Sequence, residues 1–179
     1  MPQLSASCEI SPYRRVRHSM YPRTTDPQEM LRRCRPRIRG IYQYWDAKRG
    51  SRLMPARRDI DPIEMKPWLP AIQLIDIFHN PRRMVYRLVG QVDVEFRGFN
   101  PTGRTVEECA VGASLEDALE NYNIVITQRS LVYDYADYVS ASGFLREQEC
   151  ILLPLSDDGE TVNMVLTYAE VAPVTPSSS

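Results

Sequence analysis

The last third of the chain contains three runs rich in β-branched and aromatic residues, separated by short polar turns. The runs read SLVYDYADYVS (130–140), EQECILLPLS (147–156) and TVNMVLTYAEV (161–171), with ASGFLR and SDDGET marking the turns. Connections of this length join antiparallel neighbours, because a parallel pair needs a crossover of about a dozen residues or more. This part of the chain is therefore predicted to form three adjacent strands of an antiparallel sheet.

Two further strands precede these runs as a hairpin. AIQLIDIFH (71–79) alternates as a strand, NPRR forms a turn and MVYRLVG (84–90) returns. The apolar spacing then becomes helical over residues 91–98 and, more clearly, over 114–128. A short helix is also expected from Asp61 to about Pro67. The order of helix, two strands, several short helices and three strands predicts an α+β fold.

The N-terminal region contains a helix that begins at DPQE (26–29). Asp26 can cap this helix, a proline suits its first turn, and the helix is expected to end near Gly50. Pro36 lacks a backbone N–H and crowds the preceding turn, so a kink or break is predicted there. Apolar residues follow at spacings of three and four along the helix: Met30, Leu31, Cys34, Ile38, Ile41, Tyr42 and Trp45.

This apolar stripe has two interpretations, and the sequence leaves both open. The stripe can pack on the protein's own sheet, as amphipathic helices usually do. It can also pair with the same helix of a second copy, because positions 34, 38, 41 and 45 alternate as in a coiled-coil seam. In the second case the residues of the partner or dimer helix are Met30, Leu31, Ile38, Ile41 and Trp45.

Charge divides the chain into a basic and an acidic part. Residues 1–58 hold 14 Lys/Arg and 4 Asp/Glu, whereas the remainder holds 8 and 19, so the net charge of −1 hides a strong asymmetry. The basic part can contact nucleic acid, anionic lipid or an acidic partner, or fold back on the acidic part. Protein contact is favoured, because few aromatic residues interleave the arginines. No membrane span or secretory signal is recognised, so a cytoplasmic protein is expected.

The stretch GFNPTGRT (98–105) resembles the phosphate-binding loop of nucleotide hydrolases, with Arg104 in place of the lysine. Pro101 removes one of the N–H groups that would cradle phosphate, and the acidic residues that follow would repel it. The three hairpin-linked strands also do not fit the parallel sheet of that fold. We therefore interpret the stretch as a turn, in which Asn100 starts an Asx-turn and Gly103 takes a positive φ.

Three longer segments of the chain carry a resemblance to a known family. They are YWDAKRGSRLMPARRDIDPIEMKPWLPAIQLIDI, RLVGQVDVEFRGFNPTGRTVEE and CILLPLSDDGETVNMVL, which fall within residues 42–168. On these motifs the chain resembles the PAS domain superfamily, and more closely a small bacterial branch of single-domain PAS-like proteins. The resemblance implies a five-stranded antiparallel sheet with short helices on one face, an N-terminal helix and a small cavity.

The resemblance also implies a function. PAS domains sense small molecules, cofactors or redox state, and many dimerise or signal through an N-terminal helix or the sheet face. We therefore expect a sensory or regulatory module that binds a small apolar ligand or a protein partner. Such a module would signal in trans through protein–protein contacts, as a homodimer or with a partner from a signalling pathway.

The residues can be compared with those of cofactor-binding PAS branches. The flavin photoreceptors carry a reactive Cys in an Asn-Cys-Arg-Phe-Leu-Gln run, whereas Cys109 lies in EECAVGAS, so no photoadduct is expected. The 114–128 helix has no His that could bind haem. A 4-hydroxycinnamyl chromophore needs a Cys in the cavity, and Cys109 and Cys150 leave this alternative open. The four cysteines and two histidines form no metal-like cluster, so no metal is expected. The cofactor stays unassigned.

A ligand is expected between the sheet and the helices over 91–98 and 114–128. The predicted ligand-binding residues are Tyr86, Val92, Phe96, Tyr122 and Ile126. Each of them is equally explained as an ordinary core residue. No Ser or Cys has an identifiable base, so no catalytic residues are predicted. Two alternatives stay open: a small enzyme that uses the same cavity, and nucleic-acid binding through the basic N-terminal arm.

The predicted organisation has four parts. Residues 1–25 carry Pro, Ser, Arg and Thr without periodicity over their length and are expected to be a disordered basic arm. The amphipathic helix (26–50) and the PAS-like domain (51–172) follow, and residues 173–179 are expected to form a disordered tail.

Overall fold

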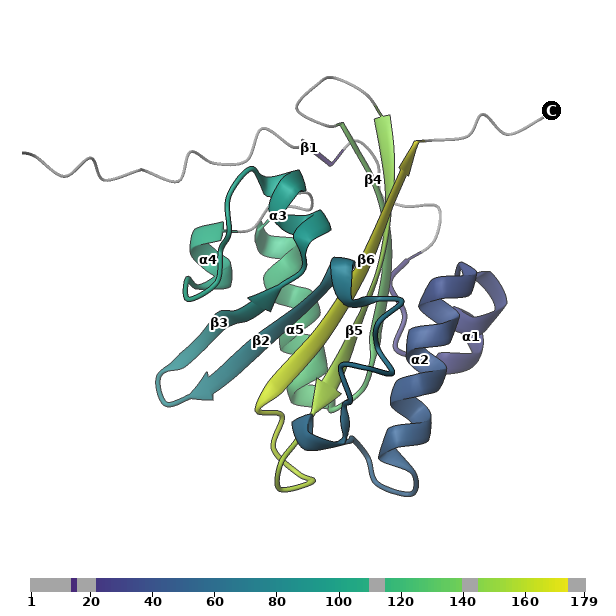
Figure 1. Cartoon of the computed structure of the whole chain (residues 1–179), viewed down its shortest axis with the longest axis vertical. Coiled ribbons are helices and arrows are strands. Elements are labelled where there is room, and N and C mark those ends of the chain that lie inside the picture. Colours follow the sequence, from purple (N-terminus) through teal and green to yellow (C-terminus); the bar gives the residue numbers. More distant parts are fainter. Residues whose placement is uncertain (1–13, 16–21, 110–114, 140–144, 174–179) are drawn as a thin grey trace, which may run out of the picture.

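The computed structural model describes residues 14–15, 22–109, 115–139 and 145–173. Its centre is one antiparallel sheet with the strand order β1-β4-β5-β6-β2-β3 (Figure 1). The strands are β1 (Arg14–Arg15), β2 (Ile72–His79), β3 (Arg82–Val89), β4 (Val132–Val139), β5 (Leu145–Leu155) and β6 (Met164–Pro173). The predicted five-stranded antiparallel sheet is confirmed, and the two residues of β1 extend its edge beside β4.

Helices cover both faces of the sheet. They are α1 (Pro27–Arg33), α2 (Pro36–Arg49), α3 (Gln91–Arg97), α4 (Val106–Cys109) and α5 (Leu115–Gln128), with the 3-10 turns η1 (Arg57–Asp59) and η2 (Leu69–Ala71). On the inner face, α5 packs against β4 and β5, whereas α2 packs on β5 and β6 from the outer face (Figure 1). The N-terminal helices and the helices between the hairpins thus lie on opposite sides of the sheet.

Local chemistry places the ends of the N-terminal helices where the sequence predicts them. The Asp26 side chain caps α1 by accepting a hydrogen bond from the Gln28 backbone N–H (2.8 Å). The helix is interrupted after Arg33, where α1 ends, and α2 begins at Pro36. At this first position the missing N–H of proline costs no helical hydrogen bond. Gly50 follows α2 with a positive φ of 58°. The predicted break at Pro36 is confirmed.

The apolar stripe of these helices packs on the chain's own sheet. Leu31 is partly buried against the core, and the other six side chains of the stripe are buried, with exposed fractions of 0 to 8%: Met30, Cys34, Ile38, Ile41, Tyr42 and Trp45. The indole N–H of Trp45 also donates to the carbonyl of Pro154 in β5 (2.9 Å). The alternative in which this helix face pairs with a second copy is therefore wrong, because the chain's own sheet covers the face.

β2 and β3 form the predicted hairpin, but the segment that precedes β2 differs from the prediction. β2 and β3 pair antiparallel from Gln73 to Arg82 across the predicted turn. The helix expected from Asp61 to Pro67 is replaced by consecutive turns over residues 62–68, which lead into η2. Pro67 lacks an N–H and disfavours helical backbone at the residue before it, so only about one turn is available for a regular helix.

The stretch over residues 98–105 is a turn that docks on β3. The Asn100 side chain accepts from the Thr102 backbone N–H (3.0 Å), and Gly103 has a φ of 86°. The Gly103 N–H donates to the carbonyl of Tyr86 (2.8 Å), and the Tyr86 N–H donates to Arg104 (3.0 Å). These backbone groups are therefore occupied within the fold, which agrees with a turn and not with a phosphate-binding loop.

The predicted arm over residues 1–25 and tail over 173–179 lie mostly outside the described residues. Where the arm is described, it follows the sheet edge: β1 pairs with the end of β4, and Thr24 exchanges two backbone hydrogen bonds with Tyr133 (2.9 Å each).

Gly90 joins β3 to α3 at a close backbone approach. A Cβ atom there would lie 2.3 Å from the carbonyl oxygen of Pro70 and 2.6 Å from that of Leu69. We predict that Gly90→Ala lowers the free energy of unfolding by about 2 kcal/mol, because rigid backbone must move to accept the methyl group. Urea unfolding measures this change. The exposed neighbour offers the control: Gln91→Ala should stay within about 0.5 kcal/mol of the wild type, and equal losses for both variants would contradict the close approach.

Candidate functional site

A small cavity of about 80 Å³ lies between the inner face of the sheet, α3 and α5. Its polar lining residues come from all of the large elements around it: Gln73, Arg97, Asn121, Tyr122, Asp134, Gln148, Cys150 and Thr167. A cavity of this volume holds about five water molecules or a ligand of a few non-hydrogen atoms. Drug-sized ligand pockets are several times larger. The volume of the cavity therefore limits any guest to a small molecule.

Asn121 contributes a buried hydrogen-bond acceptor to the lining of the cavity. Asn121 lies on α5 and is 4% exposed, and its side-chain N–H donates to Asp134 Oδ2 (2.9 Å). The other amide atom, Oδ1, is buried and has no hydrogen-bond partner among the described residues. An unpaired buried acceptor costs about 1–3 kcal/mol. A guest that donates a hydrogen bond to Asn121 would remove this cost.

Tyr122 and Thr167 face each other across the cavity. Their hydroxyl oxygens lie 3.5 Å apart, and both residues are buried. Burial raises the pKa of Tyr122 far above its ordinary value, because the phenolate would lose its hydration. Tyr122 therefore stays a neutral phenol that can donate or accept a hydrogen bond.

Arg97 brings a buried positive charge to the same cavity. Its side chain is 5% exposed, and its Nε lies 2.6 Å from Asp93 Oδ2. The guanidinium also donates to the carbonyl of Cys109 and lies over the ring of Tyr86, 5.2 Å from its centroid. These contacts fix the guanidinium in place and balance its charge. Among the described residues, no group of three His, Cys, Asp or Glu side chains could hold a metal ion.

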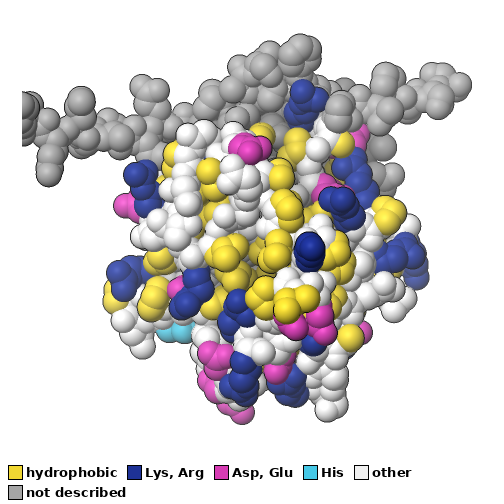
Figure 2. All heavy atoms as spheres, viewed as in Figure 1, with side chains coloured by type: hydrophobic (Ala, Val, Ile, Leu, Met, Phe, Trp, Pro, Cys, Tyr) yellow, Lys and Arg dark blue, Asp and Glu magenta, His cyan; other side chains and the backbone are white. Residues whose placement is uncertain are grey.

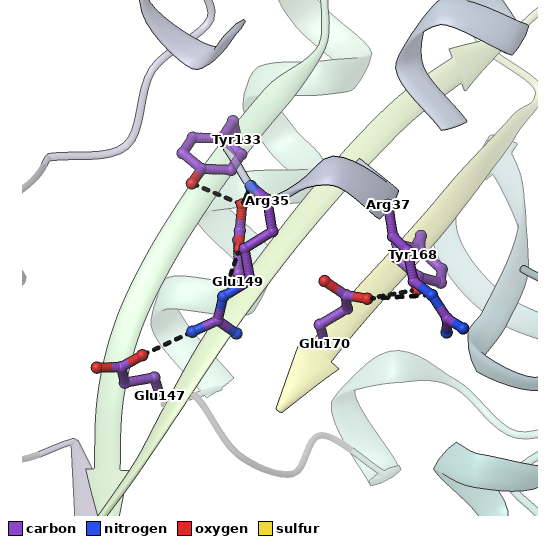
Figure 3. A network of polar contacts seen from close by, with 7 residues as sticks. All are labelled: Arg35, Arg37, Tyr133, Glu147, Glu149, Tyr168 and Glu170. Carbon is purple, nitrogen blue, oxygen red and sulfur yellow. Dashed lines mark hydrogen bonds and ion pairs between the residues drawn. The ribbon is translucent and has the colours of Figure 1, made fainter. Parts of the chain in front are cut away.

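A network of charged residues lies on the opposite, outer face of the sheet (Figure 3). Glu149 of β5 is 1% exposed, and its Oε1 accepts from the Arg35 backbone N–H (2.8 Å) and the Tyr133 hydroxyl (2.9 Å). The Arg35 guanidinium lies 3.3 Å from Glu149 Oε2 and 2.6 Å from Glu147. Arg35 separates α1 from α2, so this network attaches both helices to β5. Burial raises the pKa of Glu149 although its hydrogen bonds lower it.

The second half of the network lies on β6 (Figure 3). The Tyr168 hydroxyl donates to Glu170 Oε1 (2.9 Å), and Arg37 Nε lies 3.9 Å from the same oxygen. Burial raises the pKa of Tyr168 to about 12, so its hydroxyl stays a donor. The neighbouring residues Thr167 and Ala169 line the cavity instead. Successive residues of β6 thus serve opposite faces, as the two-residue period of a strand requires.

A groove of about 610 Å³ adjoins the cavity at the end of β6. Its walls include residues of α2, α3 and the segment around η2: Arg35, Arg37, Trp68, Pro70, Val92 and Phe96. Four residues line both hollows: Gln73, Arg97, Gln148 and Ala169. Figure 2 shows apolar side chains gathered across the middle of this face of the molecule, with charged side chains around them.

A comparison with protein families decides the assignment. Residues 34–168, which make up most of the chain, match the family model described as PAS domain. The chain belongs to the PAS domain family. PAS domains are generally sensory and not enzymatic. The family match spans α2, every residue that lines the cavity except Ala169, and the strands from β2 to Tyr168 of β6.

Solved structures similar to this PAS domain include light-oxygen-voltage proteins. One such domain, studied with a flavin analogue, is 12% identical with a TM-score of 0.47, over 62% of this chain and 82% of that chain. The Rhodobacter sphaeroides LOV protein is 11% identical (TM-score 0.46; 66% and 72%), and the Erythrobacter litoralis blue-light activated histidine kinase is 14% identical (0.44; 65% and 38%). At these values the assignment rests on the family match alone.

Two other findings accompany these comparisons. No curated protein sequence matches the chain. Within the described residues, none of the helices has the length and apolar character that crossing a membrane demands.

The structure brings only part of the predicted ligand-binding set to the PAS cavity. Tyr86 and Tyr122 line it, as the sequence predicts. Val92 is 52% exposed and lines the neighbouring groove together with Phe96, because α3 turns these side chains away from the cavity. Ile126 is buried in the hydrophobic core and lines neither hollow. The lining combines the polar residues above with apolar ones such as Val106, Ala136 and Leu152, so the small apolar ligand stays a prediction.

The polar residues that define the cavity were not recognised in the sequence. Asn121 interrupts an otherwise apolar helix face beside Tyr122, which was the available signal. Gln73 and Thr167 lie in apolar strands and pair with each other across β2 and β6. A polar residue at a position that should be buried requires a partner, so such positions are the ones to examine.

The buried carboxylate predicts a pH-dependent difference between the wild type and Glu149→Gln. Because the folded-state pKa of Glu149 is raised, the folded chain keeps this proton at pH values where the unfolded chain has released it. The wild type therefore loses stability as the pH rises through this raised pKa. Glu149→Gln keeps an acceptor for Arg35 and Tyr133 and buries no charge. The stability of the wild type relative to Glu149→Gln should fall as the pH rises from about 4, the ordinary pKa of a glutamate, through the raised pKa of Glu149.

Urea unfolding across this pH range measures the difference. Glu147→Gln is the matched control, because it removes a carboxylate from the same arginine without removing the buried one. A difference that stays constant with pH for Glu149→Gln, or that falls equally for both variants, would show that Glu149 is not the titrating group.

Proposed function

We propose that this PAS domain senses a small polar molecule held in the inner cavity and signals through protein contacts. The observation that carries this proposal is the buried Oδ1 of Asn121, a residue that lines the cavity, which has no hydrogen-bond partner among the described residues. A family of sensory domains and an unmet hydrogen-bond acceptor in its cavity point to the same role.

The chemistry of the lining defines the class of ligand. An N–H or O–H group is needed opposite Asn121 Oδ1, and the Tyr122 phenol can donate to or accept from a second polar group. The volume of about 80 Å³ limits the molecule to a few non-hydrogen atoms. We therefore favour a small amine, amide or alcohol over the apolar ligand expected from the sequence.

The sheet offers a route from the ligand to the protein surface. On β5, Gln148 and Cys150 line the cavity, while Glu147 and Glu149 hold Arg35 on the outer face. A shift of this strand in response to a ligand would therefore change the contacts of the link between α1 and α2. The proposed output is a change in how these helices meet a protein partner in trans.

Native mass spectrometry of freshly purified protein tests the ligand. We predict that the wild type carries a small molecule that is released on denaturation, and that Asn121→Leu reduces its affinity roughly tenfold or more, since one buried hydrogen bond is lost. Asn123→Leu is the control: Asn123 is exposed on the same helix and contacts Arg82, so it should leave the bound molecule in place.

A second measurement tests binding directly, in case the ligand is lost during purification. Ethanolamine, acetamide and ethylene glycol are titrated while the amide resonances of the cavity residues are followed by NMR. A bare chain mass combined with no response to any of the three probes would contradict the proposal. Equal binding by the wild type and Asn121→Leu would contradict the role of Asn121.

A further inference from the structure

β6 extends beyond its neighbour on one side. It pairs with β5 as far as Pro173, but its described pairing with β2 ends at Tyr168, which lies opposite Ile72. Residues 169–172 therefore border the groove along an edge that no described strand covers. Unpaired strand edges of this kind are templates for the addition of another strand.

The backbone of this edge is oriented for such an addition. The carbonyl of Ile72 accepts from the Gly90 N–H (2.7 Å), so it points away from β6. In an antiparallel ladder the residues of one strand direct their backbone groups alternately to the two neighbours. Thr167 consequently faces β2, and the same period turns the N–H and C=O groups of Ala169 and Val171 toward the groove.

The two walls of the groove differ in chemistry. On the inner side, Val92 and Phe96 of α3 form an apolar wall, and Val92 is 52% exposed. On the outer side lie Arg35, which pairs with Glu147 and Glu149, and Arg37, whose side chain is 67% exposed and lies 3.9 Å from Glu170. A strand added beside β6 would therefore present one face to apolar side chains and the other to arginine. The fitting segment alternates apolar residues with polar or acidic ones.

The chain contains one such segment outside the described residues. Residues 4–10 read LSASCEI, although the basic arm as a whole has no periodicity. The apolar positions are Leu4, Ala6, Cys8 and Ile10, and the polar positions are Ser5, Ser7 and Glu9. Strict alternation of this length is the pattern of a half-buried strand. Its apolar face matches the wall of α3, and its glutamate matches Arg37.

The topology indicates that this segment reaches the groove of a second copy and not its own. Arg14 lies beside β4, and a strand on the free edge of β6 is four strand spacings away, about 19 Å. Ile10 is four residues from Arg14, and this connection spans at most about 15 Å. The whole of residues 4–10 therefore cannot lie along the β6 edge of the same chain.

We propose that the protein forms a symmetric dimer in which residues 4–10 of each copy add as a strand to β6 of the other. Ala6 and Cys8 lie against α3 of the partner copy, and Glu9 lies on the side of Arg37. Each groove is complete only with the arm of the other copy. This exchange does not depend on a ligand in the inner cavity.

The alternation of the arm allows a matched test in the full-length chain. Ala6→Asp with Cys8→Asp places two charges on the apolar face, whereas Ser5→Asp with Ser7→Asp places the same two charges on the polar face, on the side of the arginines. Sedimentation equilibrium measures the dimer dissociation constant. We expect a dimeric wild type, at least a 100-fold weaker dimer for the first variant, and a change of less than about fivefold for the second.

Cross-linking locates the arm in the same dimer. A benzophenone side chain at position 6 is placed in unlabelled protein, which is mixed with ¹⁵N-labelled wild type. The expected cross-links join unlabelled to labelled chains and map to residues 91–97 or 169–172. A monomeric wild type, equal weakening by both double variants, or cross-links that map elsewhere or only within one chain would each overturn the proposal.

Discussion

The two-residue period of β5 and β6 is the constraint on which the rest of the structure depends. These strands lie at the centre of the sheet, and each is covered by helices on both faces. One set of their residues, including Gln148 and Thr167, lines the inner cavity, while Glu149 and Tyr168 hold the N-terminal helices on the outer face. Neither set can move by one position without reversing both faces.

Both faces of the sheet bury polar groups, and the free-energy cost of this burial bears on function. An apolar core of the same shape would be more stable than a cavity with an unpaired amide oxygen or a sheet with a buried carboxylate. On the outer face, Glu149 Oε1 accepts two hydrogen bonds, and the buried Oε2 has no hydrogen bond among the described residues but lies 3.3 Å from the Arg35 guanidinium. On the inner face, Asn121 Oδ1 also has no hydrogen-bond partner among the described residues. Our proposal assigns a ligand to Asn121, whereas the positive charge of Arg35 lies beside Glu149 within the chain.

The fold was largely predictable, because alternation, turn length and helix ends such as Pro36 are local properties of the sequence. The cavity was less so. The orientation of α3 depends on the close approach of Gly90 to η2, a tertiary contact, so Val92 was predicted for the cavity and lies at the groove. Asn121 and Asp134 meet only because α5 packs beneath β4. Pairs of this kind follow from packing and leave no periodic signal.

A high-resolution crystal structure of protein purified without unfolding would test the proposed sensory role most directly. The proposed role predicts density for a small molecule in the cavity, with a nitrogen or oxygen atom within about 3.2 Å of Asn121 Oδ1. Water alone in the cavity, or an Asn121 side chain satisfied by another group of the protein, would contradict it.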